Sequence, residues 1–240
     1  LDLEGNVQQQ IIDLFFKALK QRVEEEHQAG QYKDYVELLY ETGFRETVHS
    51  RAAQLAQEIA IKGWNERKAS KFLDDRFEGL LDYFIIHFGK DLNTIVLPDG
   101  ILKYEGLSLP QIDLFKLVMD YLDFGQESET IYTDFFQMPA RKVKNASHYF
   151  LFAVPKERIF FISDQSMLGS CKDGFAMTER GIYWKMPFQN PAQVSYDKLH
   201  HLVREKNWIT INDQFFNVNP SLNIKMLKLL KKLKRLHQVV

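Results

Sequence analysis

The spacing of apolar residues changes once along the 240-residue chain, and this change limits the fold more than any other feature. Before residue 138, apolar residues recur every three or four positions, as on one face of a helix. The clearest such stripe holds Phe77, Leu80, Leu81, Phe84, Ile85 and Phe88. After Pro139, short apolar runs flank turn residues, as in β-hairpins. The pattern therefore predicts the α+β class, with helices first and strands second.

The expected elements follow from the same spacing. Four helices precede a turn at residues 97–100, and a fifth begins near Ser108-Leu109-Pro110 and buries Ile112. Two hairpins are expected, with turns at Glu179-Arg180 and at Asn212-Asp213. A last helix begins near Pro220. We place an all-α domain over residues 1–138 and a strand-rich domain over residues 139–240.

Charge is sorted along the chain in a similar way. Residues 1–136 hold 14 Lys+Arg and 25 Asp+Glu, whereas residues 137–240 hold 17 and 7, although the net charge is only −1. A chain that sorts its charge favours two units. Two explanations remain open: the halves dock on each other, which is the simpler one, or the basic half meets an acidic partner.

The segment from Asp164 to Lys185 combines a strand ending in an acid, a glycine-bearing loop and a Gly-Phe…Thr…Gly-Ile-Tyr hairpin, and residues 194–199 add a Ser-Tyr pair. This string resembles bacterial pleckstrin-homology-like (PH-like) domains over about residues 140–240. The resemblance implies a small bent β-sheet or barrel capped by the C-terminal helix. It also implies a binding or assembly module without catalytic residues. The family's usual second acid is replaced here by Gln165.

Two basic clusters are the candidate binding residues. The C-terminal helix carries leucines on one face, which the resemblance assigns to the core, and cations on the rest: Lys225, Lys228, Lys231, Lys232, Lys234 and Arg235. A second cluster consists of Arg141, Lys142 and Lys144. Basic amphipathic helices bind protein grooves or anionic lipid. Nucleic acid is disfavoured because no reading motif is present and the acidic half repels phosphate.

Catalytic chemistry has weaker support. Glu24…His27 and Glu46…His49 have the Glu-x-x-His spacing of carboxylate-bridged di-iron sites, but this spacing is easily met by accident. Cys171, with His200 or His201 as a base, lacks a nucleophile motif. No cofactor is expected, because the chain has neither of the common phosphate-binding glycine motifs.

A single cysteine excludes an internal disulfide, and residues 1–20 do not resemble a signal peptide, so we expect a cytoplasmic location, extending to the periphery of the inner membrane. We expect a non-enzymatic bacterial interaction or scaffolding protein, whose partner is another protein or a second copy of the chain. The alternatives are peripheral binding to an anionic membrane through the C-terminal helix and a metal-dependent enzyme built on the N-terminal helices.

Overall fold

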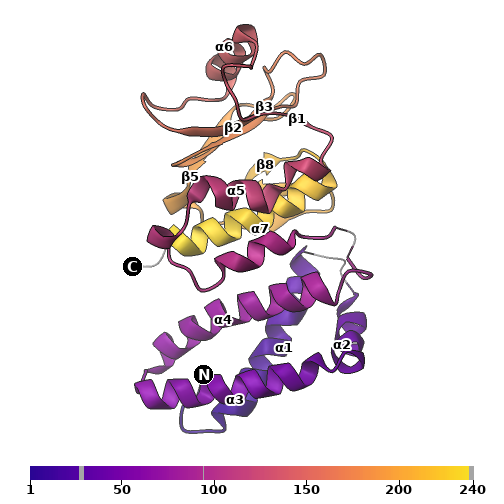
Figure 1. Cartoon of the computed structure of the whole chain (residues 1–240), viewed down its shortest axis with the longest axis vertical. Helices are drawn as coiled ribbons and strands as arrows, with labels where there is room; N and C mark the ends of the chain where they lie inside the picture. The colour runs from indigo at the N-terminus through magenta and orange to yellow at the C-terminus, as the bar shows by residue number, and fades with distance from the viewer. Residues whose placement is uncertain (27–29, 94, 238–240) are drawn as a thin grey trace. The chain divides into compact units, whose positions relative to one another are not determined.

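The computed structural model describes residues 1–26, 30–93 and 95–237 (Figure 1). They divide into two compact units, Leu1–Leu107 and Ser108–Val240. The first unit is helical, and the second combines helices with two antiparallel sheets. The expected α+β class is therefore confirmed.

The described residues of the first unit form four α-helices and a short 3-10 helix. These are α1 (Val7–Glu26), α2 (Tyr32–Glu41), α3 (Phe44–Lys62), α4 (Glu66–His87) and η1 (Asp99–Tyr104). Helix α3 packs against the other three α-helices, and Phe15 and Phe84 are fully buried in the shared core. Asn65 caps the N-terminus of α4, and its side chain accepts the Lys68 N–H at 3.0 Å. The apolar stripe that begins at Phe77 therefore covers only the second half of α4.

Part of the acidic charge of the first unit lies in its interior. The Arg22 guanidinium on α1 lies 3.2 Å from Glu26 and 2.8 Å from Asp82, and also pairs with Glu78. Burial opposes the charged guanidinium, but the three carboxylates outweigh burial and raise the pKa of Arg22 above its ordinary value. Glu78 and Asp82 therefore hold α1 to α4, and the three buried acids do not form a surface for a partner.

The second unit contains two sheets in which all neighbouring strands are antiparallel. The five-stranded sheet has the order β1 (Thr130–Tyr132), β2 (Ile159–Asp164), β3 (Gly174–Thr178), β4 (Gly181–Lys185) and β5 (Ala192–Ser195). The three-stranded sheet has the order β6 (Leu202–Arg204), β7 (Ile209–Ile211) and β8 (Gln214–Phe216). Both predicted hairpins are confirmed, as β3–β4 and β7–β8. Over the described residues the sheets are open and do not close into a barrel.

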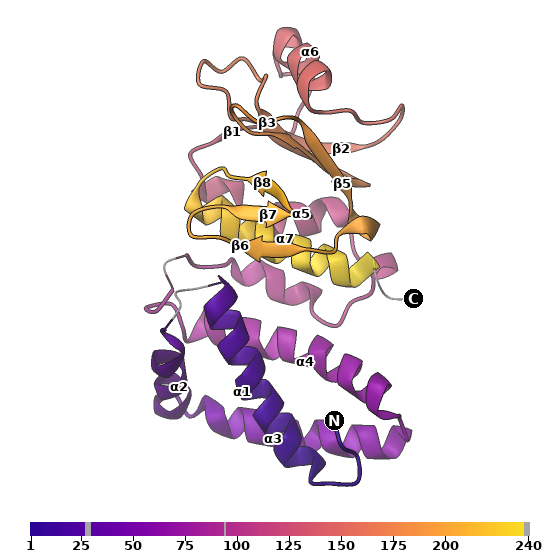
Figure 2. The ribbon, with the colours of Figure 1, turned by 180° about the vertical axis from the view of Figure 1, so that it is seen from behind.

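The remaining elements of this unit are helical. They are η2 (Leu109–Gln111), α5 (Leu114–Leu122), η3 (Phe124–Gln126), α6 (Ala140–Tyr149), η4 (Tyr196–Lys198) and α7 (Pro220–His237). Figures 1 and 2 show α7 against one face of the three-stranded sheet with α5 alongside, and α7 packs on β6, β7, η4 and α5. The leucines of α7 are core residues except Leu236, which is partly buried.

The second unit begins earlier than the expected boundary at residue 138. Helix α5 packs against α7, and Thr130 of β1 pairs with Asp164 of β2, so both segments belong with the strands. The helix expected from Ser108 is split: Ser108 and Gln111 form a capping box around η2, Ile112 is extended, and α5 starts after the cap Asp113.

Helix α6 lies where the sequence favoured strands. Its Ala146 and the following Phe150 are fully buried, one turn apart on the same side of the helix. This apolar stripe is short and follows the charged residues Arg141, Lys142 and Lys144, which explains why the spacing alone did not reveal the helix.

Candidate functional site

The cations of α7 are not gathered on one open face. Lys225, Lys228 and Lys232 retain 3%, 0% and 5% of their accessible surface. The Lys225 ammonium lies 2.6 Å from Glu127 Oε1, and this carboxylate also accepts a hydrogen bond from the Ser221 hydroxyl at 2.7 Å. The pair anchors α7 to the segment after α5. The remaining cations of this cluster, Lys231, Lys234 and Arg235, are partly buried.

The environment of Glu127 favours its charged form. Burial alone would raise the pKa of its carboxyl, but hydrogen bonds from Lys225, Ser221 and Asn219 outweigh burial and lower the pKa. The carboxylate therefore stays ionised opposite Lys225 at neutral pH and contributes to the anchoring of α7.

The second basic cluster is divided between two roles. Lys142 donates to the Tyr132 hydroxyl at 2.8 Å and to Asp164 Oδ2 at 2.9 Å. The hydrogen bond to Tyr132, reinforced by Asp164 against the opposing effect of burial, raises the pKa of the Lys142 ammonium. Arg141 and Lys144 are exposed. Lys142 is therefore structural, and its two neighbours face solvent, where a ligand can reach them.

The candidate metal ligands are not assembled into a site in the part of the chain that is described. Glu24 is half-exposed beside Lys20, Glu46 is exposed, and His49 is partly buried, while His27 lies outside the described residues. Within those residues, no cluster of three or more His, Cys, Asp or Glu side chains could hold a metal ion.

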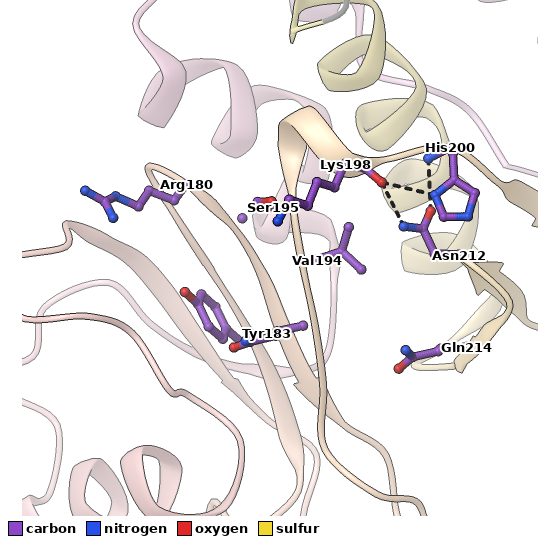
Figure 3. Close-up of a pocket in the computed structure, with 10 residues that line it drawn as sticks. Arg180, Tyr183, Val194, Ser195, Lys198, His200, Asn212 and Gln214 are labelled. Atoms are coloured by element: carbon purple, nitrogen blue, oxygen red, sulfur yellow. Dashed lines mark hydrogen bonds between the residues drawn. The ribbon is translucent and has the colours of Figure 1, made fainter.

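A groove of about 430 Å³ lies beside β5 in the second unit (Figure 3). Its lining comes from β4, β5, η4 and the β7–β8 hairpin, together with the residues flanking them: Arg180, Gly181, Tyr183, Gln193, Val194, Ser195, Lys198, His200, Asn212 and Gln214. An added Cβ at Gly181 would collide with the Val194 carbonyl oxygen, so this glycine allows β4 and β5 to approach closely.

One wall of the groove is held by the Asn212 side chain. Asn212 donates to the Lys198 carbonyl at 2.8 Å and accepts the backbone N–H of His200 at 3.0 Å, as Figure 3 shows. Asn212 and Asp213 have φ values of 48° and 66°, as a type I′ hairpin turn requires. From α7, Lys234 donates to the His200 carbonyl at 2.6 Å. One of the predicted lysines therefore supports this wall.

Strand β5 runs through the lining of the groove and is the edge strand of its sheet. The Tyr196 N–H bonds the Arg180 carbonyl at 3.0 Å. Because hydrogen bonding alternates along an antiparallel ladder, Val194 directs its backbone groups to β4, and Gln193 and Ser195 direct theirs away from it. The groove therefore borders backbone donors and acceptors that an extended chain can pair with.

The charge of the groove lining is positive. Arg180, Lys198 and the exposed His200 contribute cations or donors, and the ten lining residues include no Asp or Glu. The carboxylates beside the lining residues have partners: Glu157 contacts the Tyr183 hydroxyl, Asp213 pairs with His201, and Asp197 accepts from the Ser195 hydroxyl, which is the largest cause of its lowered pKa. The groove thus offers cations to a ligand while its neighbouring acids are engaged.

The reactive side chains of this unit have structural roles. The Tyr183 hydroxyl lies 3.1 Å from Glu157 Oε1, and burial, with Glu157, raises the pKa of Tyr183 to about 12. Burial likewise raises the pKa of the Cys171 thiol to about 12, which disfavours the thiolate that a nucleophile needs. Cys171 lies in the β2–β3 loop, at the sheet end opposite the β3–β4 turn, so the structure does not unite it with His200.

Comparison with protein-family models, with curated proteins and with solved structures finds no match to this chain. None of the helices in the described ranges is both long and apolar enough to cross a bilayer. The function therefore has to be argued from the groove and the surfaces themselves.

The sequence predicted the turn at Asn212 but not the groove. The cations of the groove, Arg180 and Lys198, are separated along the chain and belong to no charged run. The signal that was available is the Asn-Asp pair, at which a hairpin turn was expected, although nothing in the pair shows which segments the Asn212 side chain joins.

Proposed function

We propose that the second unit is a protein-interaction module that binds an extended, acidic segment of a partner protein along the free edge of β5. The supporting observation is that the outward backbone groups of Gln193 and Ser195 border a groove whose lining carries cations and no carboxylate. Strand addition uses main-chain hydrogen bonds for affinity and side-chain contacts for selectivity. This role agrees with the binding module that the PH-like resemblance implies.

The roles of the residues follow from their positions. Gln193 and Ser195 would pair with the backbone of the bound segment, and Arg180 and Lys198, which both line the groove, would contact its acidic side chains. Charge-assisted contacts of this kind select the partner and speed association more than they add affinity. No bond-making step is required, in keeping with a scaffolding role.

The test is selection of displayed random peptides on the full chain, followed by fluorescence anisotropy with a selected peptide. We expect enrichment of peptides that contain Asp or Glu. Reversing the charge of both groove cations, Arg180→Glu with Lys198→Glu, should lower the affinity for the selected peptide by about tenfold or more. Lys71→Glu with Lys206→Glu makes the same change in net charge at exposed positions outside the groove lining and should leave affinity unchanged.

Unchanged affinity in the groove variant, or peptides without acidic residues, would contradict the proposal. Sedimentation of the wild-type chain tests whether a second copy of the chain supplies the segment that binds to β5. A dimer that the selected peptide dissociates would mean that a second copy of this chain supplies it.

A further inference from the structure

Two loops at one end of the five-stranded sheet expose large apolar side chains. Met167 and Leu168 in the β2–β3 loop retain 89% and 94% of their accessible surface, and Phe188 in the β4–β5 turn retains 96%. The pairings of Gly174 with Asp164 and with Lys185 place both loops at the same end of the sheet. The groove cation Arg180 lies in the β3–β4 turn at the other end. We call Met167, Leu168 and Phe188 the apolar tips.

The β2–β3 loop is held in place by its own hydrogen bonds. Asp164 Oδ1 accepts the N–H groups of Ser166 and Cys171 at 3.0 and 3.1 Å, and its Oδ2 pairs with Lys142 of α6. Asn145 of α6 donates to the Ser170 carbonyl at 2.6 Å. Figures 1 and 2 show α6 beside this loop. Met167 and Leu168 are therefore exposed by a braced loop.

Phe188 is exposed despite an unfavourable backbone conformation. Its φ is 62°, in the left-handed region that favours Gly, Asn or Asp over an aromatic residue. An almost fully exposed ring gains nothing from packing that would offset this conformation. Strained residues of this kind concentrate at functional sites, so the ring itself points to a ligand.

The surroundings of the apolar tips are basic. Segments 140–150, 164–174 and 185–191 hold five Lys or Arg residues and two Asp residues. Both aspartates are engaged, Asp164 with Lys142 and Asp173 with Lys185. The exposed cations are Arg141, Lys144 and Lys172. On these segments a ligand therefore meets protruding apolar groups beside exposed cations.

We propose that this end of the sheet docks on an anionic membrane surface, with Met167, Leu168 and Phe188 inserted at the level of the headgroups and acyl chains. The tips protrude from separate loops, a shape that suits a deformable apolar layer. Buried apolar area and attraction of Lys and Arg to anionic headgroups together determine such binding. The residues differ from those of the groove, so this inference and the proposed function can fail independently.

The test is co-sedimentation of the full chain with vesicles of phosphatidylcholine mixed with phosphatidylglycerol, compared with phosphatidylcholine alone. We expect binding to the mixed vesicles that weakens as salt is raised. Met167→Ser with Leu168→Ser should reduce partitioning by about tenfold or more, because the lost apolar area supplies the insertion. Ile61→Ser, at a position on α3 that is 76% exposed, is the matched apolar control and should have no effect.

Two further variants separate binding from folding. Phe188→Asn suits the left-handed conformation, so it should lower partitioning while the unfolding midpoint stays the same or rises. Lys144→Glu with Lys172→Glu should abolish the preference for phosphatidylglycerol, whereas Lys71→Glu should not. The proposal is overturned if the wild-type chain does not bind mixed vesicles, or if the Met167→Ser/Leu168→Ser variant binds them equally. A change of oligomeric state in that variant would also overturn it, because the tips would then be a contact between copies.

Discussion

At one end of the five-stranded sheet, beside the Glu179-Arg180 turn, the surface is concave and polar, whereas at the other end apolar side chains protrude from two loops. A short polar side chain helps to brace each end: Asn212 joins the groove wall, and Asp164 closes the β2–β3 loop. Similar bracing thus supports different chemistry. The groove offers backbone groups and cations, and the apolar tips offer insertable area, so we expect the two ends to bind different partners independently.

The largest effect is expected from Asp164→Ala, which should disrupt the β2–β3 loop, and with it the apolar tips, but not the groove. It removes the acceptor of two backbone N–H groups and leaves the partly buried Lys142 without its carboxylate. The free energy of unfolding of the second unit should fall by about 3 kcal/mol, measured by urea titration. Vesicle binding should be lost and the selected peptide should still bind.

Asp173→Ala is the matched control for this change, because Asp173 lies in the same loop and also pairs with a lysine, Lys185 of β4, but is more exposed. It should cost about 1 kcal/mol or less. Equal costs for the two variants would show that Asp164 does not brace the loop in the way described.

An intermediate effect is expected from Glu127→Gln. This variant tests whether the anchoring of α7 matters for the groove but not for the apolar tips. Loss of the charged partner of the buried Lys225 should cost about 2 kcal/mol at neutral pH. Because folding lowers the pKa of Glu127 below its ordinary value of 4.5, the stabilisation is present above about that pH and is lost as pH falls through the folded pKa.

Urea titrations of the wild type and Glu127→Gln over a pH series measure this difference. The two curves should converge in acid, and peptide affinity should decline more than vesicle binding, since Lys234 of α7 holds the His200 carbonyl. A difference in stability that is independent of pH would contradict the role assigned to the Glu127 carboxylate.

The smallest effect is expected from Asn212→Gly, which keeps the positive φ of the turn but removes the side chain that joins the groove wall. Stability should fall by about 1 kcal/mol, and peptide affinity should fall while vesicle binding stays unchanged. Asp213→Gly is the matched control in the same turn. It should lower peptide affinity less, because the Asp213 side chain is highly exposed and pairs with His201, which does not line the groove.

The sequence predicted the class of fold, the helices around Ile11 and Phe77, and both hairpins, because these depend on local periodicity and on turn residues such as Asn212. It placed the second unit too late, since the packing of α5 on α7 joins segments far apart in the chain. The burial of Lys225 was equally hidden, because its partner Glu127 precedes it by almost a hundred residues.

The candidate sites show the same limit. The cations of α7 attracted attention as a run, yet the groove uses Arg180 and Lys198, which only the strand register brings together. The apolar tips were also inconspicuous, because an exposed Met-Leu pair resembles any core pair until the fold shows that nothing covers it.

The most direct measurement is amide hydrogen exchange of the full chain with and without a saturating acidic peptide from the selection. Strand addition predicts slower exchange at Gln193 and Ser195, whose N–H groups point away from β4, and little change at Val194, whose N–H already pairs with β4. Unchanged exchange at Gln193 and Ser195, with new protection elsewhere in the chain, would contradict binding along the edge of β5.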